Sequence, residues 1–246
     1  MTIARLPLFP LNSVLFPGLV LPLNIFEERY RAMMRDLLKL DEDAPRRFAV
    51  VAIRDGREVA PSAPGMPDAT ALPERGPAAG FGEDPIQAFH GVGCVADAAT
   101  IREKEDGGFD VLATGTTRFR LTSVDASGPY LVGELESLPE EQGEGAGALA
   151  SGVLRAFRTY QKRLAGANER SLSTEQELPD EPSVLSYLVA AAAVLDTPVK
   201  QSLLEAPDTA DRLRQELRIL RSESSMIRNI PSLPAADLTR KPTSPN

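Results

Sequence analysis

His90 is the first place to look for covalent chemistry, because it is the only histidine among the 246 residues. A Ser-His-Asp triad would have to use it, and a zinc ion would find no second imidazole. His90 follows Phe89 at the end of a short apolar run, which is typical of a satisfied or solvated strand residue. The sequence therefore predicts neither a catalytic residue nor a metal ligand at this position.

Cys94 is equally alone, since the chain has a single cysteine. It can form neither an internal disulfide nor a site built from several thiolates. Its neighbours in the run 91–96 are small or apolar, as in a strand. We expect a buried core cysteine, the commonest state of a free thiol.

The lysines exclude a nucleotide site of the common kind. A phosphate-binding loop needs a Gly-Lys-Ser/Thr run, so that backbone amides and the lysine surround the phosphates. No lysine of this chain follows a glycine, which holds for Lys39, Lys104, Lys162, Lys200 and Lys241. The sequence thus predicts no Walker-type ATP site, and we expect no bound cofactor.

Glu27, Arg29 and Tyr30 form the sharpest group of polar candidates. Asn24 followed by Glu27 matches a capping box, which predicts a helix from about residue 25. Tyr30 would then lie on the apolar stripe that Phe26 begins. The pattern therefore favours a structural role for all three residues.

Arginines supply two further candidates. Arg118 precedes Phe119 in a strand-like run, where an arginine more often ties a turn to a sheet than contacts a ligand. Arg214, Arg218 and Arg221 share one face of the last expected helix, where they would attract nucleic acid or pair with acidic neighbours. Solvated ion pairing is the ordinary outcome for such a face.

An apolar turn is the last candidate, and the only one that suggests a binding surface. Leu15, Phe16, Pro17 and Leu19 surround the expected turn at residues 16–18. If exposed together, they would suit an unfolded peptide; core packing is the alternative. A type II turn with Pro17 at its second position would also place Gly18 at positive φ.

These candidates must be positioned by short strands and by helices. Apolar runs between Gly, Pro and Asp clusters predict strands over 3–8, 19–23, 48–53, 86–89, 92–101, 109–113, 118–124 and 130–138. The first two carry prolines, which places them at a sheet edge or a first position. Tight turns between such strands indicate a small, curved, mostly antiparallel sheet or barrel.

Helical spacing of apolar residues dominates the carboxy-terminal part of the chain. It predicts helices over 149–164, 184–195 and 197–204, and a last helix that starts after Asp208. The expected class is α+β, with a β-rich module over 1–140 and a helical bundle over 148–230. We expect a mobile surface loop over about 60–85, a linker over 140–147 and a disordered tail over 231–246.

The opening run LPLFPLNSVLFPGLVLPLNIFEERYRAMM resembles the start of the Lon protease amino-terminal (substrate-binding) domain. That pattern is PLFPL, then FPG, then PL-x-IFE-x-RY before a helix, and runs at 91–96, 115–121 and 129–132 extend it. The resemblance implies a PUA-like β-rich module, with one early helix, followed by a helical module. It also implies a stand-alone form, because the chain has no room for the family's ATPase and protease domains.

Composition bounds the function. The chain is 42% hydrophobic, enough for a sizeable core, and no stretch reads as a signal peptide or a membrane span, so we expect a cytoplasmic protein. Residues 1–140 carry 14 Lys and Arg against 21 Asp and Glu, whereas residues 141–246 carry 13 against 14. The acidic half disfavours nucleic acid, whose phosphates attract basic modules.

Two functions therefore follow from the sequence. The first is a non-enzymatic Lon-type substrate-binding protein that recognises polypeptide segments or docks to a protease or partner protein, without metal or membrane. The alternative is an RNA-binding or RNA-modification accessory protein, because PUA-like folds also bind RNA. The absence of Trp and a 5% aromatic content weigh against that alternative, since few rings are left to stack on bases.

Overall fold

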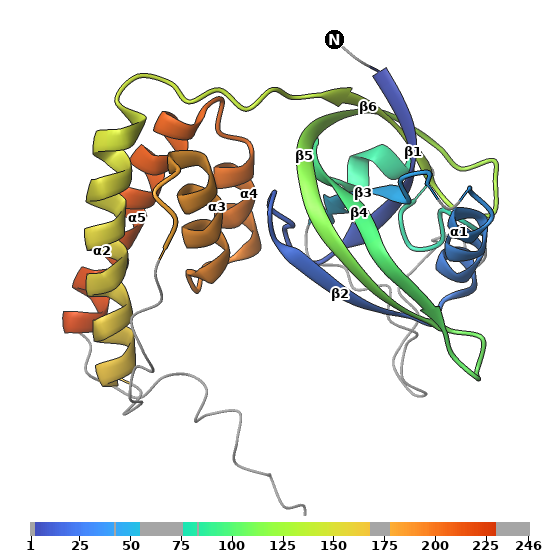
Figure 1. Cartoon of the computed structure of the whole chain (residues 1–246), viewed down its shortest axis with the longest axis horizontal. Coiled ribbons are helices and arrows are strands. Elements are labelled where there is room, and N and C mark those ends of the chain that lie inside the picture. The colour runs from blue at the N-terminus through green and yellow to red at the C-terminus, as the bar shows by residue number, and fades with distance from the viewer. Residues whose placement is uncertain (1–2, 42, 55–75, 83, 168–177, 230–246) are drawn as a thin grey trace, which may run out of the picture. The chain divides into compact units, whose positions relative to one another are not determined.

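A computed structural model of the chain describes residues 3–41, 43–54, 76–82, 84–167 and 178–229 (Figure 1). The chain divides into two compact units, one from residues 1–140 and 191–205, the other from 141–190 and 206–246. The segment 191–205, which the sequence assigns to a helical module, thus groups with the β-rich unit. Most of the expected loop over 60–85 and all of the expected tail over 231–246 lie outside the described residues.

Six strands of the described residues form the sheet of the first unit. They are β1 (Ile3–Leu11), β2 (Val20–Ile25), β3 (Arg47–Ala52), β4 (Val92–Glu103), β5 (Phe109–Asp125) and β6 (Val132–Ser137). Their order is β2-β5-β4-β3-β1-β6, and β5 also pairs with β6, so the sheet curves round and closes (Figure 1). Every pair is antiparallel except β1 with β3. The predicted α+β class and the curved, mostly antiparallel sheet are confirmed.

β5 makes this closure possible because it is long enough to pair with two strands along one edge, while β4 pairs along the other. Its first part pairs with β2, from Val20 opposite Thr114 to Ile25 opposite Phe109. Its second part pairs with β6. The two strands predicted at 109–113 and 118–124 are therefore one strand, which runs through Gly115.

Three other expectations about strands need correction. The run 86–89 forms a 3-10 helix, η2 (Pro85–Ala88), because Pro85 suits the first position of a helix. β1 extends to Leu11 and lies between β3 and β6 rather than at an edge. Its prolines are tolerated because neither neighbouring strand pairs with the whole of β1. β6 pairs with residues 3–7 and β3 pairs with residues 8–11. β2 does lie at an edge, as its proline predicts.

The core of the first unit lies on both sides of β3, whose residues after Arg47 are all buried. One side is formed by β1, β2, α1 (Glu28–Leu38) and β5, and it includes Phe9, Met33, Met34, Phe48 and Phe109. The other side includes Leu8, Val51, Phe89, Phe119 and Leu135. Burial of each large side chain stabilises the fold by about 1.5–3 kcal/mol.

The second unit is helical. Its described helices are α2 (Ala146–Ala167), α3 (Pro182–Ala192, whose last two residues fall in the first unit) and α5 (Thr209–Asn229). The remaining helix, α4 (Thr197–Leu204), belongs to the first unit. Asp208 caps α5, since its Oδ1 accepts a hydrogen bond from the Asp211 amide at 2.8 Å. None of the helices in the described ranges is both long and apolar enough to span a membrane.

Candidate functional site

The apolar turn at residues 16–18 is not the exposed patch that one interpretation of the sequence required. Leu15 and Phe16 are buried, with Phe16 only 1% exposed, and Pro17 and Leu19 are half-buried. The alternative of core packing therefore holds for the first two residues. Gly18 has φ +78°, as the type II turn predicts, and the Leu19 amide donates to the Phe16 carbonyl at 3.2 Å.

Gly115 explains why this turn is held against the sheet. The Gly18 amide donates to the Gly115 carbonyl at 2.8 Å, and the Gly115 amide donates to the Leu19 carbonyl at 2.9 Å. A Cβ atom at Gly115 would lie 2.4 Å from the Phe16 carbonyl oxygen, so only glycine permits this approach. The close contact with Gly115 holds the turn against β5, where Phe16 is buried.

Phe26 is the residue that is exposed instead. The sequence placed it on the apolar stripe of a helix beginning near residue 25, but α1 begins at Glu28 and Glu27 is its N-cap. Asn24 cannot cap the helix because it is still part of β2, opposite Asp110. Phe26 thus lies between strand and helix, and it is 68% exposed.

A cleft of about 280 Å³ adjoins Phe26. It lies between the carboxy-terminal ends of β1 and β2 and the start of α1. Its lining is mostly apolar and aromatic, and consists of Phe9, Pro10, Leu11, Asn12, Leu23, Asn24, Ile25, Phe26, Glu27, Arg29, Tyr30, Ile53 and Phe81. The volume is at the low end for a ligand pocket, which suits one or two amino-acid side chains better than a large cofactor.

Arg29 organises one wall of this cleft through its hydrogen bonds. Its guanidinium forms an ion pair with Glu27, at 2.7 Å between Nη2 and Oε2. It also donates to the carbonyls of Pro77 and Ala79, at 3.3 and 2.9 Å. Arg29 therefore fixes the segment 76–82 against the start of α1, which leaves it few donors for a ligand.

The same guanidinium lies over two aromatic rings of the cleft. Its Cζ is 4.8 Å from the ring centroid of Tyr30 and 5.2 Å from that of Phe81. The Tyr30 ring in turn packs on Phe9, with centroids 4.4 Å apart, and burial raises the pKa of the Tyr30 hydroxyl. Stacked in this way, the aromatic wall keeps its shape without a ligand.

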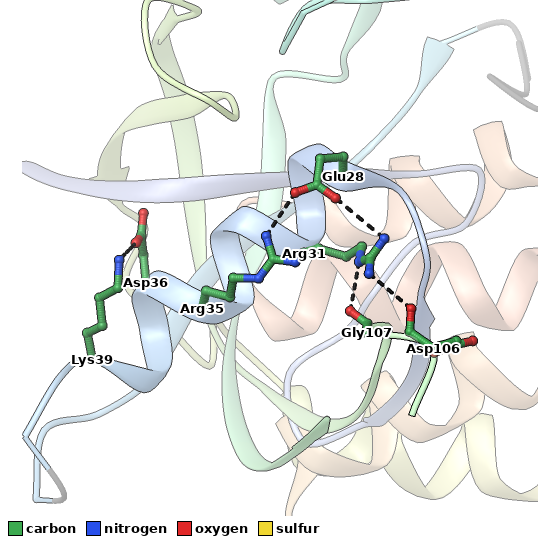
Figure 2. Close-up of polar contacts among 7 residues, drawn as sticks. All are labelled: Glu28, Arg31, Arg35, Asp36, Lys39, Asp106 and Gly107. Atoms are coloured by element: carbon green, nitrogen blue, oxygen red, sulfur yellow. Dashed lines mark hydrogen bonds and ion pairs between the residues drawn. The ribbon is translucent and has the colours of Figure 1, made fainter. Parts of the chain in front are cut away.

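α1 is fixed by its polar face, which Figure 2 shows. Arg31 donates to the carbonyl of Gly107 at 2.7 Å and to that of Asp106 at 3.1 Å, which ties the helix to the turn between β4 and β5. Glu28 pairs with Arg35 at 2.8 Å, and this hydrogen bond lowers the pKa of the Glu28 carboxyl. The start of α1, and with it Phe26 and the aromatic wall, is thus held in place.

The edge of β2 supplies backbone groups beside the cleft. Among the described strands, β2 pairs only with β5. Leu19 and Gly115 share a hydrogen bond, and hydrogen-bonded positions alternate along an antiparallel pair, so Val20, Pro22 and Asn24 turn their backbone groups away from β5. Pro22 has no N–H, and Asn24 therefore offers, next to the cleft, an N–H and a C=O that no described strand uses.

Arg118 and Phe119 lie away from the cleft and within the core of the same unit. Arg118 is 4% exposed; it donates to the carbonyl of Leu204 at 2.8 Å and contacts the Glu140 carboxylate at 3.2 Å. It thereby joins β5 to the end of α4, where a cation is favoured. Phe119 is 1% exposed. Both positions agree with the structural role that the sequence favours.

His90 and Cys94 both belong to the β-rich unit. The His90 Nδ1 lies 4.0 Å from a carboxylate oxygen of Glu205. Cys94 is fully buried, and burial raises the pKa of its thiol to about 12. Within the described ranges, no group of three His, Cys, Asp or Glu side chains could hold a metal ion.

The sequence did not predict this cleft. It favoured a structural role for Glu27, Arg29 and Tyr30, placed Phe26 on the apolar stripe of a helix and did not single out Phe81, and the structure places all five residues in the lining. Because Asn24 pairs with β5, α1 starts later than expected and Phe26 is left exposed. A single sequence does not reveal that pairing. No local signal identifies Phe81, because it reaches the cleft through long-range contacts of Arg29.

Comparison with known families settles the relationship. The model of the family described as ATP-dependent protease La (LON) substrate-binding domain matches residues 5–222. This chain belongs to the Lon substrate-binding domain family. The predicted resemblance is confirmed, and so is a general substrate-binding role at the level of the family.

Individual relatives agree with this family. A Lon protease from Azorhizobium caulinodans is 24% identical over 225 residues, which are 90% of this chain and 23% of the relative. Lon protease 1 from Syntrophobacter fumaroxidans is 33% identical over 138 residues, which are 55% of this chain and 17% of the relative. The chain therefore spans no more than about a quarter of these curated relatives.

Solved structures support the same fold. The amino-terminal domain of a Mycobacterium avium complex Lon protease has a TM-score of 0.56 at 18% identity, covering 90% of this chain and 98% of that one. A Lon amino-terminal domain protein from Xanthomonas campestris has a TM-score of 0.54 at 23% identity, covering 87% and 98%. At these identities the likeness concerns the fold.

Proposed function

We propose that this chain binds extended, apolar polypeptide segments in the cleft between β1 and β2, with Phe26 as the contact that a client meets first. The observation that carries the proposal is the exposure of Phe26, 68%, beside a cleft whose walls are aromatic and already ordered. A large exposed aromatic next to an apolar hollow is the usual composition of a recognition hot spot.

The backbone beside the cleft suits the same client. Asn24 offers an N–H and a C=O that no described strand uses at the edge of β2, so an extended segment could add hydrogen bonds there while one side chain enters the cleft. Pro22 removes the next donor along this edge. Recognition would therefore be short and tolerant of sequence, as expected for binding of unfolded clients.

The decisive experiment compares two exposed apolar residues of the same unit. Phe26→Ser should weaken binding of a fluorescent, unfolded model polypeptide such as casein by about tenfold, because a hot-spot aromatic contributes more than about 1 kcal/mol. Leu40→Ser is the matched control, since Leu40 is 43% exposed and does not line the cleft. Equal affinities for the wild type and the Phe26 variant would refute the proposal.

We further propose that the chain contributes binding and no catalysis. The family model that it matches describes the substrate-binding domain and not the ATPase or protease of Lon. Purified protein should give no ATP hydrolysis and no casein degradation above buffer. Activity that copurifies with the protein, and is lost on mutation of one of its own residues, would contradict this.

A further inference from the structure

A second hollow lies in the helical unit, between α2 and α5, which run side by side (Figure 1). Its volume is about 330 Å³. Its lining differs from that of the cleft, because arginine and hydroxyl side chains alternate with a few apolar ones: Gly152, Arg155, Ala156, Thr159, Arg163, Leu217, Leu220, Arg221 and Ser224. We name it the α2–α5 groove.

Three arginines give the α2–α5 groove its charge. Arg155 and Arg221 are exposed, and Arg163 is half-buried, with Nη1 donating to the Ser224 carbonyl at 2.6 Å. Among the residues that the structure describes, no acidic side chain lines the groove and none forms an ion pair with these three arginines. By contrast, Arg214, which lies on α5 like Arg221, forms an ion pair with Asp211. The groove is thus a local site of positive charge in a chain of net charge −8.

We propose that the α2–α5 groove binds an acidic segment of a polypeptide, at a site other than the apolar cleft. Arg155 and Arg163 are eight residues apart on one helix, so their charges are spread over roughly 12 Å. That spacing suits carboxylates several residues apart better than a single compact anion. Leu217 and Ala156 add apolar wall for the peptide between its charges.

Nucleic acid fits the groove less well than an acidic peptide. Duplex DNA carries one charge per about 1.7 Å, and proteins that bind it commonly neutralise about six to ten phosphates. Three arginines provide less than that, and the net charge of −8 repels any long polyanion. A peptide with a few Asp or Glu residues carries less charge than a long polyanion, so the net charge of the protein repels it less.

The test uses a fluorescein-labelled peptide of alternating Glu and Ala residues and a Lys and Ala peptide of equal length. The full chain should bind the Glu peptide with an affinity that falls as salt is raised, and the groove should not bind the Lys peptide. The double variant Arg155→Gln/Arg221→Gln should weaken this binding about tenfold, the order expected for loss of two ion pairs.

A matched double variant controls for total charge. Arg158 and Arg218 are exposed arginines of the same two helices that do not line the groove. Arg158→Gln/Arg218→Gln removes the same charge and should change the affinity less than about twofold, since these side chains do not line the groove and exposed charges without a direct contact contribute little. An apolar peptide without acidic residues, bound through Phe26, should bind both double variants as it binds wild type, which separates the two sites.

Several outcomes would overturn the proposal. They are no binding of the Glu peptide, equal losses in the two double variants, and tighter groove-dependent binding of a mixed-sequence RNA than of the peptide. Groove-dependent dimerisation without peptide binding, seen by sedimentation, would also overturn it in favour of a second copy of this chain. Circular dichroism of each variant verifies that the helices are intact.

Discussion

The apolar cleft of the β-rich unit and the α2–α5 groove of the helical unit are similar in volume, about 280 and 330 Å³, yet they use arginine in opposite ways. In the cleft, the Arg29 side chain is 9% exposed and its donors hold a carboxylate and two carbonyls. In the groove, Arg155 and Arg221 are exposed and unpaired with any described acidic group.

The difference shows which residues are available to a partner. An arginine whose donors are used by its own protein positions the walls of a site, whereas one without such contacts can form them with a ligand. Arg29 belongs to the run that resembles the Lon family, so a family motif marks the structural residue here. The groove arginines belong to no such run.

The largest expected effect separates the two phenylalanines of the β-rich unit. Phe16→Ser should lower the free energy of unfolding of this unit by about 3–5 kcal/mol, because Phe16 is 1% exposed and its loss leaves a cavity. Phe26→Ser should change it by less than about 0.5 kcal/mol, as expected for an exposed side chain. Casein binding should show the reverse order in the folded fraction.

Cys94 allows this measurement to report on one unit alone. It is the only cysteine, it is fully buried, and burial raises its pKa to about 12. Reaction of its thiol with a disulfide reagent in increasing urea therefore reports opening of the β-rich unit. A Phe16 variant that reacts no faster than wild type would show that this residue is not part of the core.

The next effect tests the contrast between the arginines directly. Arg29→Met should lower the stability of the β-rich unit by about 2–3 kcal/mol, because the Arg29 side chain is itself largely buried and hydrogen bonds of a charged group are worth about 1.5–3 kcal/mol. Arg221→Met, the control in the groove, should change the stability of the helical unit by less than about 0.5 kcal/mol. Similar costs at both positions, in urea unfolding, would remove the distinction drawn between the two sites.

Much of the fold could be predicted because its determinants are local. The helical spacing after residue 148 depends on neighbouring residues, and the structure confirms α2, α3 and α5. The prediction failed where a long-range contact decides the local state. Gly115 appeared to end a strand, but it continues β5 because the turn at Phe16 packs on it.

The site was harder to predict for the same reason. Burial of Phe16 depends on hydrogen bonds to Gly115, and exposure of Phe26 depends on the pairing of Asn24 with β5. One contact joins Phe16 to Gly115 and the other joins Asn24 to Asp110, so no short window of sequence contains both partners. The groove arginines were visible only in part, since Arg221 was noted on its helix face but Arg155 lies on another helix.

A pH-dependent effect tests whether the helical unit also contains a structural ion pair. Glu216 on α5 is buried, and neither of its carboxylate oxygens accepts a hydrogen bond from a described residue. Burial raises the pKa of this carboxyl well above its ordinary 4.5, although the charge of Arg212 opposes that shift. Glu216 is thus expected to retain its proton in the folded state at pH values where the unfolded chain has lost it.

Stability of α5 should therefore be highest below pH 4.5 and fall as the pH rises through the folded pKa of Glu216, by at most about 1.4 kcal/mol per pH unit. Hydrogen exchange of the α5 amides measures this, and Glu216→Gln should abolish the slope. Stability that rises with pH would instead mean that Glu216 is ionised and paired with Arg212, as Glu27 is with Arg29 in the cleft.

The smallest effect distinguishes the cleft from the neighbouring turn. Gly18 has φ +78°, and a Cβ atom there would meet nothing within 4 Å, so Gly18→Ala costs only the strain of the left-handed backbone. That cost is about 1 kcal/mol, measurable as faster labelling of Cys94 in urea. Gly18 does not line the cleft, and casein binding by the folded variant should therefore equal that of wild type. Loss of binding in Gly18→Ala, with Phe26→Ser still binding, would move the client site from the cleft back to the turn.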